Sequence, residues 1–113
     1  SLFKSDIVKI FNKKNNINIK EIYLVSISGK LKKKWRQHIN AKKILICITG
    51  VYKFFYINNK KIKTLLIKEN EYVVVPKKII FKFDGNSLLK TKILVLSDKE
   101  NNKLKSKNFF NFS

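Results

Sequence analysis

The chain has few of the residues on which disulfides, metal centres and membrane-spanning helices depend. Among its 113 residues there are one cysteine, one proline, three glycines and no methionine. A single cysteine excludes a disulfide framework within the chain and a zinc site built from cysteines. No apolar run approaches the ~20 residues of a membrane-spanning helix. Acidic side chains are also scarce, with seven against 26 basic ones.

The length and the apolar content predict one compact domain. The residues are 44% hydrophobic and 12% aromatic, which is too apolar for a wholly disordered chain. A chain of this length can bury one hydrophobic core but not two. Lys4, Asp6 and Lys9 interrupt the first ten residues, so no secretory apolar segment is predicted there. We therefore expect a soluble, cytoplasmic, single-domain protein.

The formal net charge of +19 has two interpretations. It is typical of proteins that bind nucleic acid, an anionic membrane surface or anionic metabolites. The joint excess of Lys, Ile, Asn and Phe is also what an A/T-rich coding sequence produces without selection for charge, and we favour this interpretation. The lysines are spread along the chain. Arginine, which makes bidentate contacts to bases and phosphates, occurs once, as Arg36. Neither nucleic acid nor a membrane is expected as the main partner.

Short segments rich in strand-forming residues, separated by turn residues, predict an all-β fold. The predicted strands are residues 22–28, 44–49, 51–57, 62–67, 72–75, 79–83 and 93–96. The segment 44–49 is apolar on both faces and is therefore predicted to be a central strand. Seven or eight strands of this length indicate a β-sandwich or barrel.

The two ends of the chain are harder to interpret. In residues 1–13 the apolar side chains have roughly helical spacing, but a strand of a longer β-arm remains an alternative. Residues 98–113 are polar and predict a tail or a short helix. We divide the chain into an N-terminal arm or helix with its connector (1–19), a barrel (20–97) and a C-terminal tail (98–113).

Two stretches approximate the two sequence motifs of the cupin barrel. The first motif, G-x5-H-x-H-x3,4-E-x6-G, is matched by Gly29, Arg36-Gln37-His38, Lys43 and Gly50, with one extra residue after Gly29. The second motif, G-D-x4-P-x-G-x2-H-x3-N, is matched by Asn70-Glu71, Pro76, Lys78, Phe81 and Gly85. The four positions that hold a metal ion in cupins are thus occupied by Arg36, His38, Lys43 and Phe81. Two cations and a phenyl ring cannot hold a divalent ion, so a metal-dependent dioxygenase or oxalate enzyme is rejected and no cofactor is expected.

Trp35-Arg36-Gln37-His38 followed by Leu45-Ile46-Cys47-Ile48-Thr49-Gly50 resembles the nucleotide-sugar branch of the RmlC-like cupins. These are the dTDP-4-dehydrorhamnose 3,5-epimerases and, more closely, the WxcM-like dTDP-4-keto-6-deoxyglucose 3,4-ketoisomerases. The ketoisomerases read R-G-x-H-A-H-K and then L-I-C-V-S-G, after a strand of the R-V-Y-Y type where Glu21-Ile22-Tyr23-Leu24 stands here. The resemblance spans about residues 20–112. It implies a single cupin jelly roll, a homodimer and a place in the biosynthesis of surface-polysaccharide sugars.

The resemblance also implies a chemistry. The carbonyl of a 4-keto sugar acidifies the hydrogens on the neighbouring carbons, so isomerisation needs a base, a proton donor and positive charge near the enolate oxygen. The family arginine falls on Lys33, and the first motif histidine, which carries the catalytic base in the epimerases, falls on Arg36. Only His38 remains, and its ordinary pKa of about 6.5 suits a base.

Strand alternation adds further candidate residues. It places Arg36 on the same face as His38 and opposite Trp35, so Arg36 would stabilise the enolate or bind the diphosphate bidentately. Tyr52 and Tyr56 share a face, and either phenol would supply the proton or stack on the ligand. The remaining substrate-binding candidates are Lys33, Trp35, Phe81 and Phe83.

Each of these side chains also has a structural interpretation, with the tyrosines and Trp35 as packing residues and Lys33 as a solvated charge. Two functional alternatives stay open as well. The missing first histidine allows a sugar-nucleotide-binding cupin without catalysis. The lysines and aromatic residues allow a basic β-barrel that binds single-stranded nucleic acid.

Overall fold

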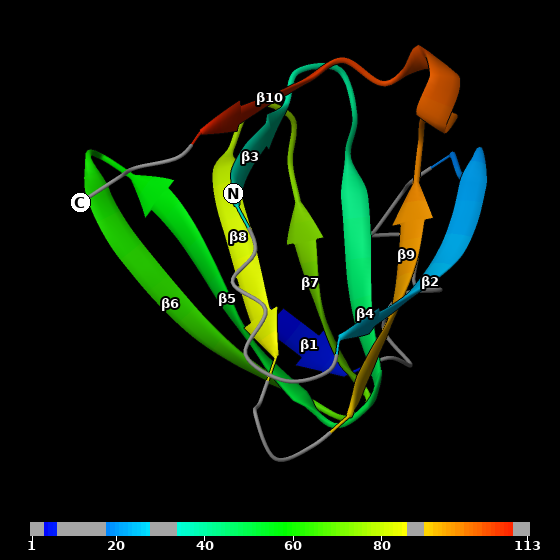
Figure 1. Ribbon diagram of the computed structural model, residues 1–113, viewed down its shortest axis with the longest axis vertical. Coiled ribbons are helices and arrows are strands. Elements are labelled where there is room, and N and C mark those ends of the chain that lie inside the picture. The colour runs from blue at the N-terminus through cyan, green and yellow to red at the C-terminus, as the bar shows by residue number, and fades with distance from the viewer. Residues whose placement is uncertain (1–3, 7–17, 28–33, 86–89, 110–113) are drawn as a thin grey trace.

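The computed structural model consists of two antiparallel β-sheets that pack face to face (Figure 1). It describes residues 4–6, 18–27, 34–85 and 90–109. The strands are β1 (Lys4–Asp6), β2 (Glu21–Ile27), β3 (Trp35–His38), β4 (Lys43–Thr49), β5 (Val51–Asn58), β6 (Lys61–Lys68), β7 (Glu71–Val75), β8 (Ile80–Gly85), β9 (Thr91–Ser97) and β10 (Ser106–Phe109). A short 3₁₀ turn, η3 (Asn101–Lys103), lies between β9 and β10. The described residues include no helix long and apolar enough to cross a membrane.

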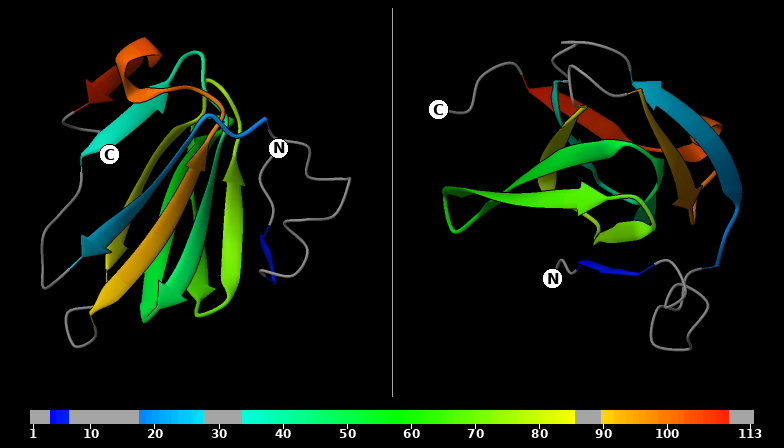
Figure 2. Two further views of the ribbon diagram at one scale, coloured as in Figure 1. Left: turned by 90° about the vertical axis from the view of Figure 1, so that its right-hand side faces the viewer. Right: turned by 90° about the horizontal axis from the view of Figure 1, so that it is seen from below.

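The chain passes from one sheet to the other at most of its connections. One sheet has the strand order β1-β7-β4-β9-β2, and the other has the order β10-β3-β8-β5-β6. Of the consecutive strands, only β5 and β6 pair directly as a hairpin, with Asn59 and Lys60 at positive φ in the turn. This alternation between two antiparallel sheets gives the predicted all-β jelly roll. Figure 2 shows the two layers from the side and from below.

The main core lies between the sheets because alternate residues of the facing strands point inward. Its fully buried members are mostly aliphatic in the first sheet and aromatic in the second. They include Leu45, Cys47, Val73, Val75, Val95, Tyr52, Phe54 and Phe81. A second buried cluster of Ile44, Ile46, Tyr72, Val74 and Leu96 lies on the other face of the first sheet. The prediction of a central strand at 44–49 is therefore confirmed.

The turn between β4 and β5 requires glycine. Gly50 has a φ of +79°, in the region that L side chains rarely adopt. A Cβ at this position would lie 2.7 Å from Thr91 Oγ1 and 2.8 Å from the carbonyl oxygen of Lys90. The backbone of the β4–β5 connection thus packs directly against the start of β9.

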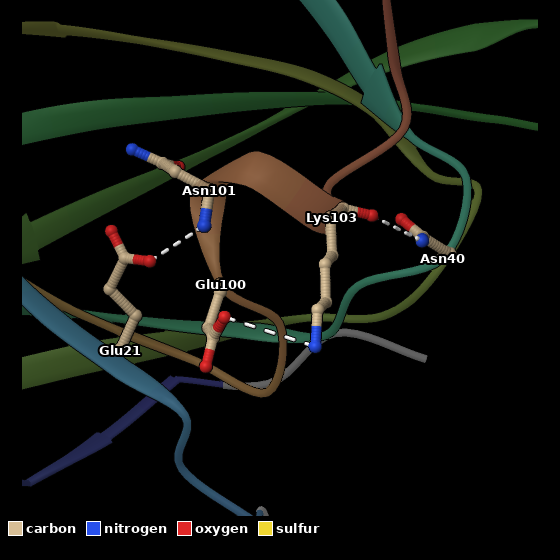
Figure 3. A network of polar contacts seen from close by, with 5 residues as sticks. All are labelled: Glu21, Asn40, Glu100, Asn101 and Lys103. Carbon is tan, nitrogen blue, oxygen red and sulfur yellow. Dashed lines mark hydrogen bonds and ion pairs between the residues drawn. The ribbon is translucent and has the colours of Figure 1, made fainter.

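The C-terminal segment forms part of the second sheet. After η3, β10 pairs with β3 in a register that sets Ser106 opposite His38. Figure 3 shows the polar contacts that fix this segment: Glu21 accepts a hydrogen bond from the Asn101 N–H at 2.6 Å, and the Asn40 amide donates to the Lys103 carbonyl at 2.9 Å. The segment predicted as a tail or short helix thus contains both a 3₁₀ turn and a strand.

At the N-terminal end, β1 pairs with β7, with Ser5 opposite Tyr72. Within residues 4–6 the strand alternative is therefore confirmed. The rest of the predicted arm up to residue 17 lies outside the described residues.

Candidate active site between the sheets

A cavity of about 80 Å³ lies between the two sheets. Five strands line it, three from the first sheet and two from the second. The lining residues are Tyr23, Val25, Arg36, His38, Lys43, Leu45, Phe81, Phe83 and Val95. All four side chains at the metal-ligand positions of the cupin motifs thus surround one space.

The end of β3 at His38 is held by contacts to Lys78 and by pairing with β10. The His38 carbonyl oxygen accepts a hydrogen bond of 2.7 Å from the Lys78 N–H. The neighbouring Gln37 side chain donates to the Lys78 carbonyl at 2.7 Å. The His38 imidazole is only 5% exposed, and its ring centroid lies 5.3 Å from that of Phe81. Arg36 and His38 both face the cavity, as strand alternation predicts.

The surroundings of His38 keep its imidazole neutral. Burial, followed by the positive charges of Lys43 and Arg36, lowers the pKa of His38 to about 4. Its Nδ1 is buried and has no hydrogen-bond partner among the described residues. Buried polar atoms are nearly always paired in native structures. A neutral imidazole with an unpaired ring nitrogen, beside a cavity, is suited to accept a proton or a hydrogen bond from a ligand.

Two further cations surround the same cavity. Lys43 is 4% exposed, and its ammonium donates a hydrogen bond of 2.8 Å to the Tyr23 hydroxyl. The Arg36 guanidinium carbon lies 5.9 Å from the centroid of the Phe83 ring. No Asp or Glu is among the lining residues. The cavity therefore favours anions, or groups that become anionic during a reaction.

The donor atoms of the cavity do not suit a metal ion. A cupin metal site requires several imidazoles and usually a carboxylate. Here one imidazole is accompanied by an ammonium, a guanidinium and a phenyl ring. Over the described ranges no group of three or more His, Cys, Asp or Glu side chains is placed to hold a metal ion.

The other predicted site residues that the structure describes, Tyr52, Tyr56 and Trp35, are not among the residues that line the cavity. Tyr52 faces the core, where its hydroxyl donates to the Leu45 carbonyl at 2.8 Å. Burial, followed by the nearby Cys47 and Glu71, raises the pKa of Tyr52 well above its ordinary value. Tyr56 packs against the same core, with its ring centroid 6.0 Å from that of Phe54.

Trp35 lies on the opposite face of β3 from His38, where the Lys82 ammonium is 5.1 Å from its ring centroid. Lys33 lies outside the described residues. Of the predicted site residues, the structure thus brings His38, Arg36, Phe81 and Phe83 together at the cavity.

Tyr52→Phe tests whether this phenol has a structural role. We expect the substitution to lower the free energy of unfolding by about 1–2 kcal/mol, because the buried Leu45 carbonyl loses its side-chain donor. Urea titration followed by fluorescence measures the change. Tyr56→Phe is the matched control for stability, since the Tyr56 hydroxyl has no hydrogen-bond partner in the described part of the chain. Equal stability of the two variants would contradict the structural role.

Tyr23 is not among the predicted site residues, and Lys43 is predicted only as the residue that replaces a metal ligand of the cupin motif. Lys43 stands at a motif position and is the one charged residue at the start of an apolar strand, and both features could have marked it. Tyr23 lies between the exposed Ile22 and Leu24. Apolar residues thus occur on both faces of β2, so the sequence offers no sign of which face turns inward.

Neither the family models nor the curated protein sequences give a match to this chain. Its fold, however, is similar to several solved structures. QdtA, a sugar 3,4-ketoisomerase from Thermoanaerobacterium thermosaccharolyticum in complex with TDP, aligns with a TM-score of 0.65 and 15% identity, over 73% of this chain and 61% of QdtA. The WlaRB TDP-quinovose 3,4-ketoisomerase from Campylobacter jejuni aligns with a TM-score of 0.70 and 19% identity, over 79% of this chain and 69% of that enzyme.

The same fold occurs in a protein of another kind. CENP-C from Drosophila melanogaster, in a structure bound to CAL1, aligns with a TM-score of 0.65 and 8% identity, over 73% of this chain and 68% of CENP-C. Identities this low establish a shared fold and not a shared activity. The chain spans about three fifths of the length of QdtA, with 61% of that enzyme covered. The protein therefore has the cupin-type jelly-roll fold that is found in the sugar-nucleotide 3,4-ketoisomerases.

Proposed function

We propose that the protein is a metal-independent isomerase or epimerase that acts on a dTDP-linked 4-keto-6-deoxy sugar. The observation that carries this proposal is the combination, around one cavity, of a neutral imidazole with an unpaired Nδ1 and two cations. Keto-sugar isomerisation requires these two elements, a base and positive charge near the developing enolate. The fold similarity to enzymes described as sugar 3,4-ketoisomerases supports the choice of substrate class.

The reaction proceeds by proton transfer at carbon. His38 accepts a proton from the carbon next to the carbonyl and becomes an imidazolium. The electron pair of the broken C–H bond forms the C=C bond of the enolate, and the carbonyl oxygen takes the negative charge. The Arg36 guanidinium is placed to stabilise this charge by hydrogen bonding. Return of a proton to a ring carbon completes the epimerisation or the migration of the keto group.

The size of the cavity limits what it receives. At about 80 Å³ it is much smaller than the ~300–1,000 Å³ of a typical ligand pocket. We therefore expect it to enclose only the reacting edge of the sugar, while the nucleotide lies outside it.

The proposal is tested by incubating the protein with dTDP-4-keto-6-deoxyglucose in deuterated water. We expect deuterium at a ring carbon and a rearranged keto sugar, both detected by NMR. Absence of deuterium and of product, with no measurable TDP binding, would refute the proposal.

One observation favours a second candidate, a sugar-nucleotide-binding module without catalysis. Arg36 replaces the histidine that carries the base in the epimerases, and its charge lowers the pKa of the remaining His38 further. A base with so low a pKa is weaker than an ordinary histidine. TDP binding without turnover, unaffected by His38→Ala, would support this module.

We propose further that the protein functions as a cytoplasmic homodimer in the biosynthesis of surface-polysaccharide sugars, as the sequence resemblance implies.

The position and the exposed residues of strand β2 support the proposed dimer. β2 is an edge strand in the described sheets, and Ile22 and Leu24 are 58% and 54% exposed on it. No lysine occurs within β2, whereas the edge strand β6 of the other sheet has Lys61, Lys63 and Lys68. Lysines on an edge strand hinder pairing with another chain, so β2 is the edge open to a second copy.

The double substitution Ile22→Lys and Leu24→Lys is expected to shift the protein from dimer to monomer, because it adds charge to both exposed apolar positions of this edge. Sedimentation equilibrium measures the mass in solution. Ile62→Lys, a change of the same kind at a 45% exposed position on β6, should leave the dimer intact. A wild-type protein that sediments as a monomer would contradict the proposed dimer.

A further inference from the structure

The connection between β3 and β4 has a cavity residue at each end. His38 is the last residue of β3, Lys43 is the first residue of β4, and both line the cavity. Residues 39–42 join them, and Ala41 within this connection is only 1% exposed. The two strands belong to different sheets, so no ladder of backbone hydrogen bonds joins them. The separation of the imidazole and the ammonium therefore depends on how this short connection is held.

Asn40 holds the first half of the connection against residues 98–105, which we call the clasp. Its side-chain amide donates a hydrogen bond of 2.9 Å to the Lys103 carbonyl (Figure 3). The side-chain oxygen of Asn40 accepts one of 2.9 Å from the Lys105 N–H. The N–H of the preceding residue, Ile39, donates to the Lys105 carbonyl at 2.8 Å. One asparagine side chain thus pairs with both a carbonyl and an N–H of the clasp, as a neighbouring strand would.

Asp98 holds the second half of the connection. Its carboxylate accepts a hydrogen bond of 2.9 Å from the Lys42 N–H, and its own N–H donates to the Lys42 carbonyl at 3.2 Å. Farther along the clasp, the Asn101 N–H donates to the carboxylate of Glu21, the first residue of β2 (Figure 3). The clasp therefore contacts the start of β2 and the connection between β3 and β4. These three strands carry every polar side chain among the lining residues of the cavity.

We propose that the clasp is a positioning device, which acts through the Asn40 and Asp98 side chains to hold the imidazole and the cations of the cavity at a fixed separation. Neither Asn40 nor Asp98 is among the residues that line the cavity, so both act through the backbone of the connection. This inference rests on the proposed function and extends it to residues that do not touch the substrate.

The physical reason is the precision that proton transfer requires. A base must lie within hydrogen-bond reach of the proton that it takes, and a misplacement of about 1 Å can lower the rate about 10²-fold. Without the hydrogen bonds of the clasp, the ends of β3 and β4 are free to move apart. Such a movement widens the cavity, admits water and separates the base from the neighbouring charge.

Asn40→Ala tests the proposal, because it removes both side-chain hydrogen bonds of Asn40 to the clasp. We expect kcat for deuterium exchange to fall about tenfold, while KM and the dissociation constant for TDP stay within about threefold, because no group that contacts the ligand is lost. The pKa of His38, measured by NMR of the imidazole carbons, should rise from about 4 toward its ordinary value. The cause would be better solvation of the imidazole and a greater distance from Lys43.

Three companion variants complete the experiment. Asp98→Ala removes the acceptor for the Lys42 N–H and should have the same effects as Asn40→Ala, so either variant provides the test if the other does not fold. Asp98→Asn keeps an acceptor of the same shape and should restore most of the activity. Asn58→Ala removes an asparagine side chain from the exposed end of β5 and should change none of the measured quantities.

The outcomes distinguish this inference from the proposed function. If the alanine variants have a lower urea midpoint but the kcat and the His38 pKa of the wild-type protein, the clasp has only a structural role, and the inference is overturned while the isomerase stands. Loss of TDP affinity at an unchanged kcat would place the effect in ligand binding and would also overturn it. If the wild-type protein catalyses no exchange, the proposed function falls. The pKa of His38 then still tests the clasp, and an unchanged value in Asn40→Ala would end this inference too.

Discussion

Replacing His38 by glutamine is expected to lower the rate of deuterium exchange into the keto sugar by about 10²–10⁴-fold, the usual contribution of a general base. His38 is the only histidine of the chain. The other lining residues are two cations, a tyrosine that accepts a hydrogen bond from one of them, and apolar side chains. Glutamine keeps a similar size and can form hydrogen bonds, but it cannot take up a proton near neutral pH. The rate is measured by NMR of the sugar in deuterated water.

Binding and folding are the controls for this variant. The affinity for TDP and the urea midpoint of His38→Gln should stay close to those of the wild-type protein. An exchange rate equal to that of the wild-type protein would contradict the assignment of His38 as base. Loss of exchange together with TDP binding and cooperative unfolding would instead show that the buried imidazole is structural.

The pH profile distinguishes the role of His38 in the same experiment. Because the pKa of His38 is lowered to about 4, the imidazole stays neutral well below pH 6.5. We therefore expect kcat/KM to decline only as the pH falls toward about 4, where His38 becomes protonated in the free protein. Between pH 6.5 and 4 the unfolded chain binds a proton at this residue that the folded protein does not. Stability should thus also decrease through this window as the pH falls, and His38→Gln should reduce that dependence.

Much of this site could be predicted from the sequence, because two patterns agree. The spacing of the motifs identifies the positions around the cavity, and the alternation of strand residues identifies the side chains that face it. The motif positions place Arg36, His38, Lys43 and Phe81 around one cavity if the fold is a cupin barrel, and the structure brings them there. Strand alternation then determines which side chains face inward. Both arguments depend on regular strands, and β3, β4 and β8 are regular at these positions.

The remaining features depend on tertiary contacts that leave no local pattern. In the sequence the phenol of Tyr52 is as compatible with catalysis as with packing. Only the structure shows that it donates a hydrogen bond to the Leu45 carbonyl on β4, in the opposite sheet. The sequence of β10 is polar and lacks alternation, yet it pairs with β3 because the turn at η3 directs it there. The contact between Lys43 and Tyr23 joins strands 20 residues apart in the chain, and strand patterns carry no information on such pairs.

Replacing Phe54 by alanine is expected to lower the free energy of unfolding by about 3–5 kcal/mol, the usual cost of deleting a large buried aromatic side chain. Phe54 is fully buried in the core between the sheets. Its ring stacks on that of Phe81 at a centroid distance of 5.6 Å. The Phe81 ring centroid in turn lies 5.3 Å from that of the His38 imidazole. The substitution therefore removes core packing and also loosens one wall of the cavity. Urea titration measures the first effect, and NMR of the His38 imidazole measures the second.

Phe55→Ala is the matched control, because the same residue type is removed one position along β5. The Phe55 ring lies on the outer face, where its centroid is 5.1 Å from the Lys82 ammonium. We expect the free energy of unfolding to fall by only about 1 kcal/mol, because this contact is partly exposed. The NMR signals of the His38 imidazole should not change. A natural domain has about 5–15 kcal/mol of stability in total, so Phe54→Ala should bring the protein close to unfolding while Phe55→Ala should not. Equal losses would mean that β5 does not place one face in the core, and the inward position of the whole cavity wall would then be in error.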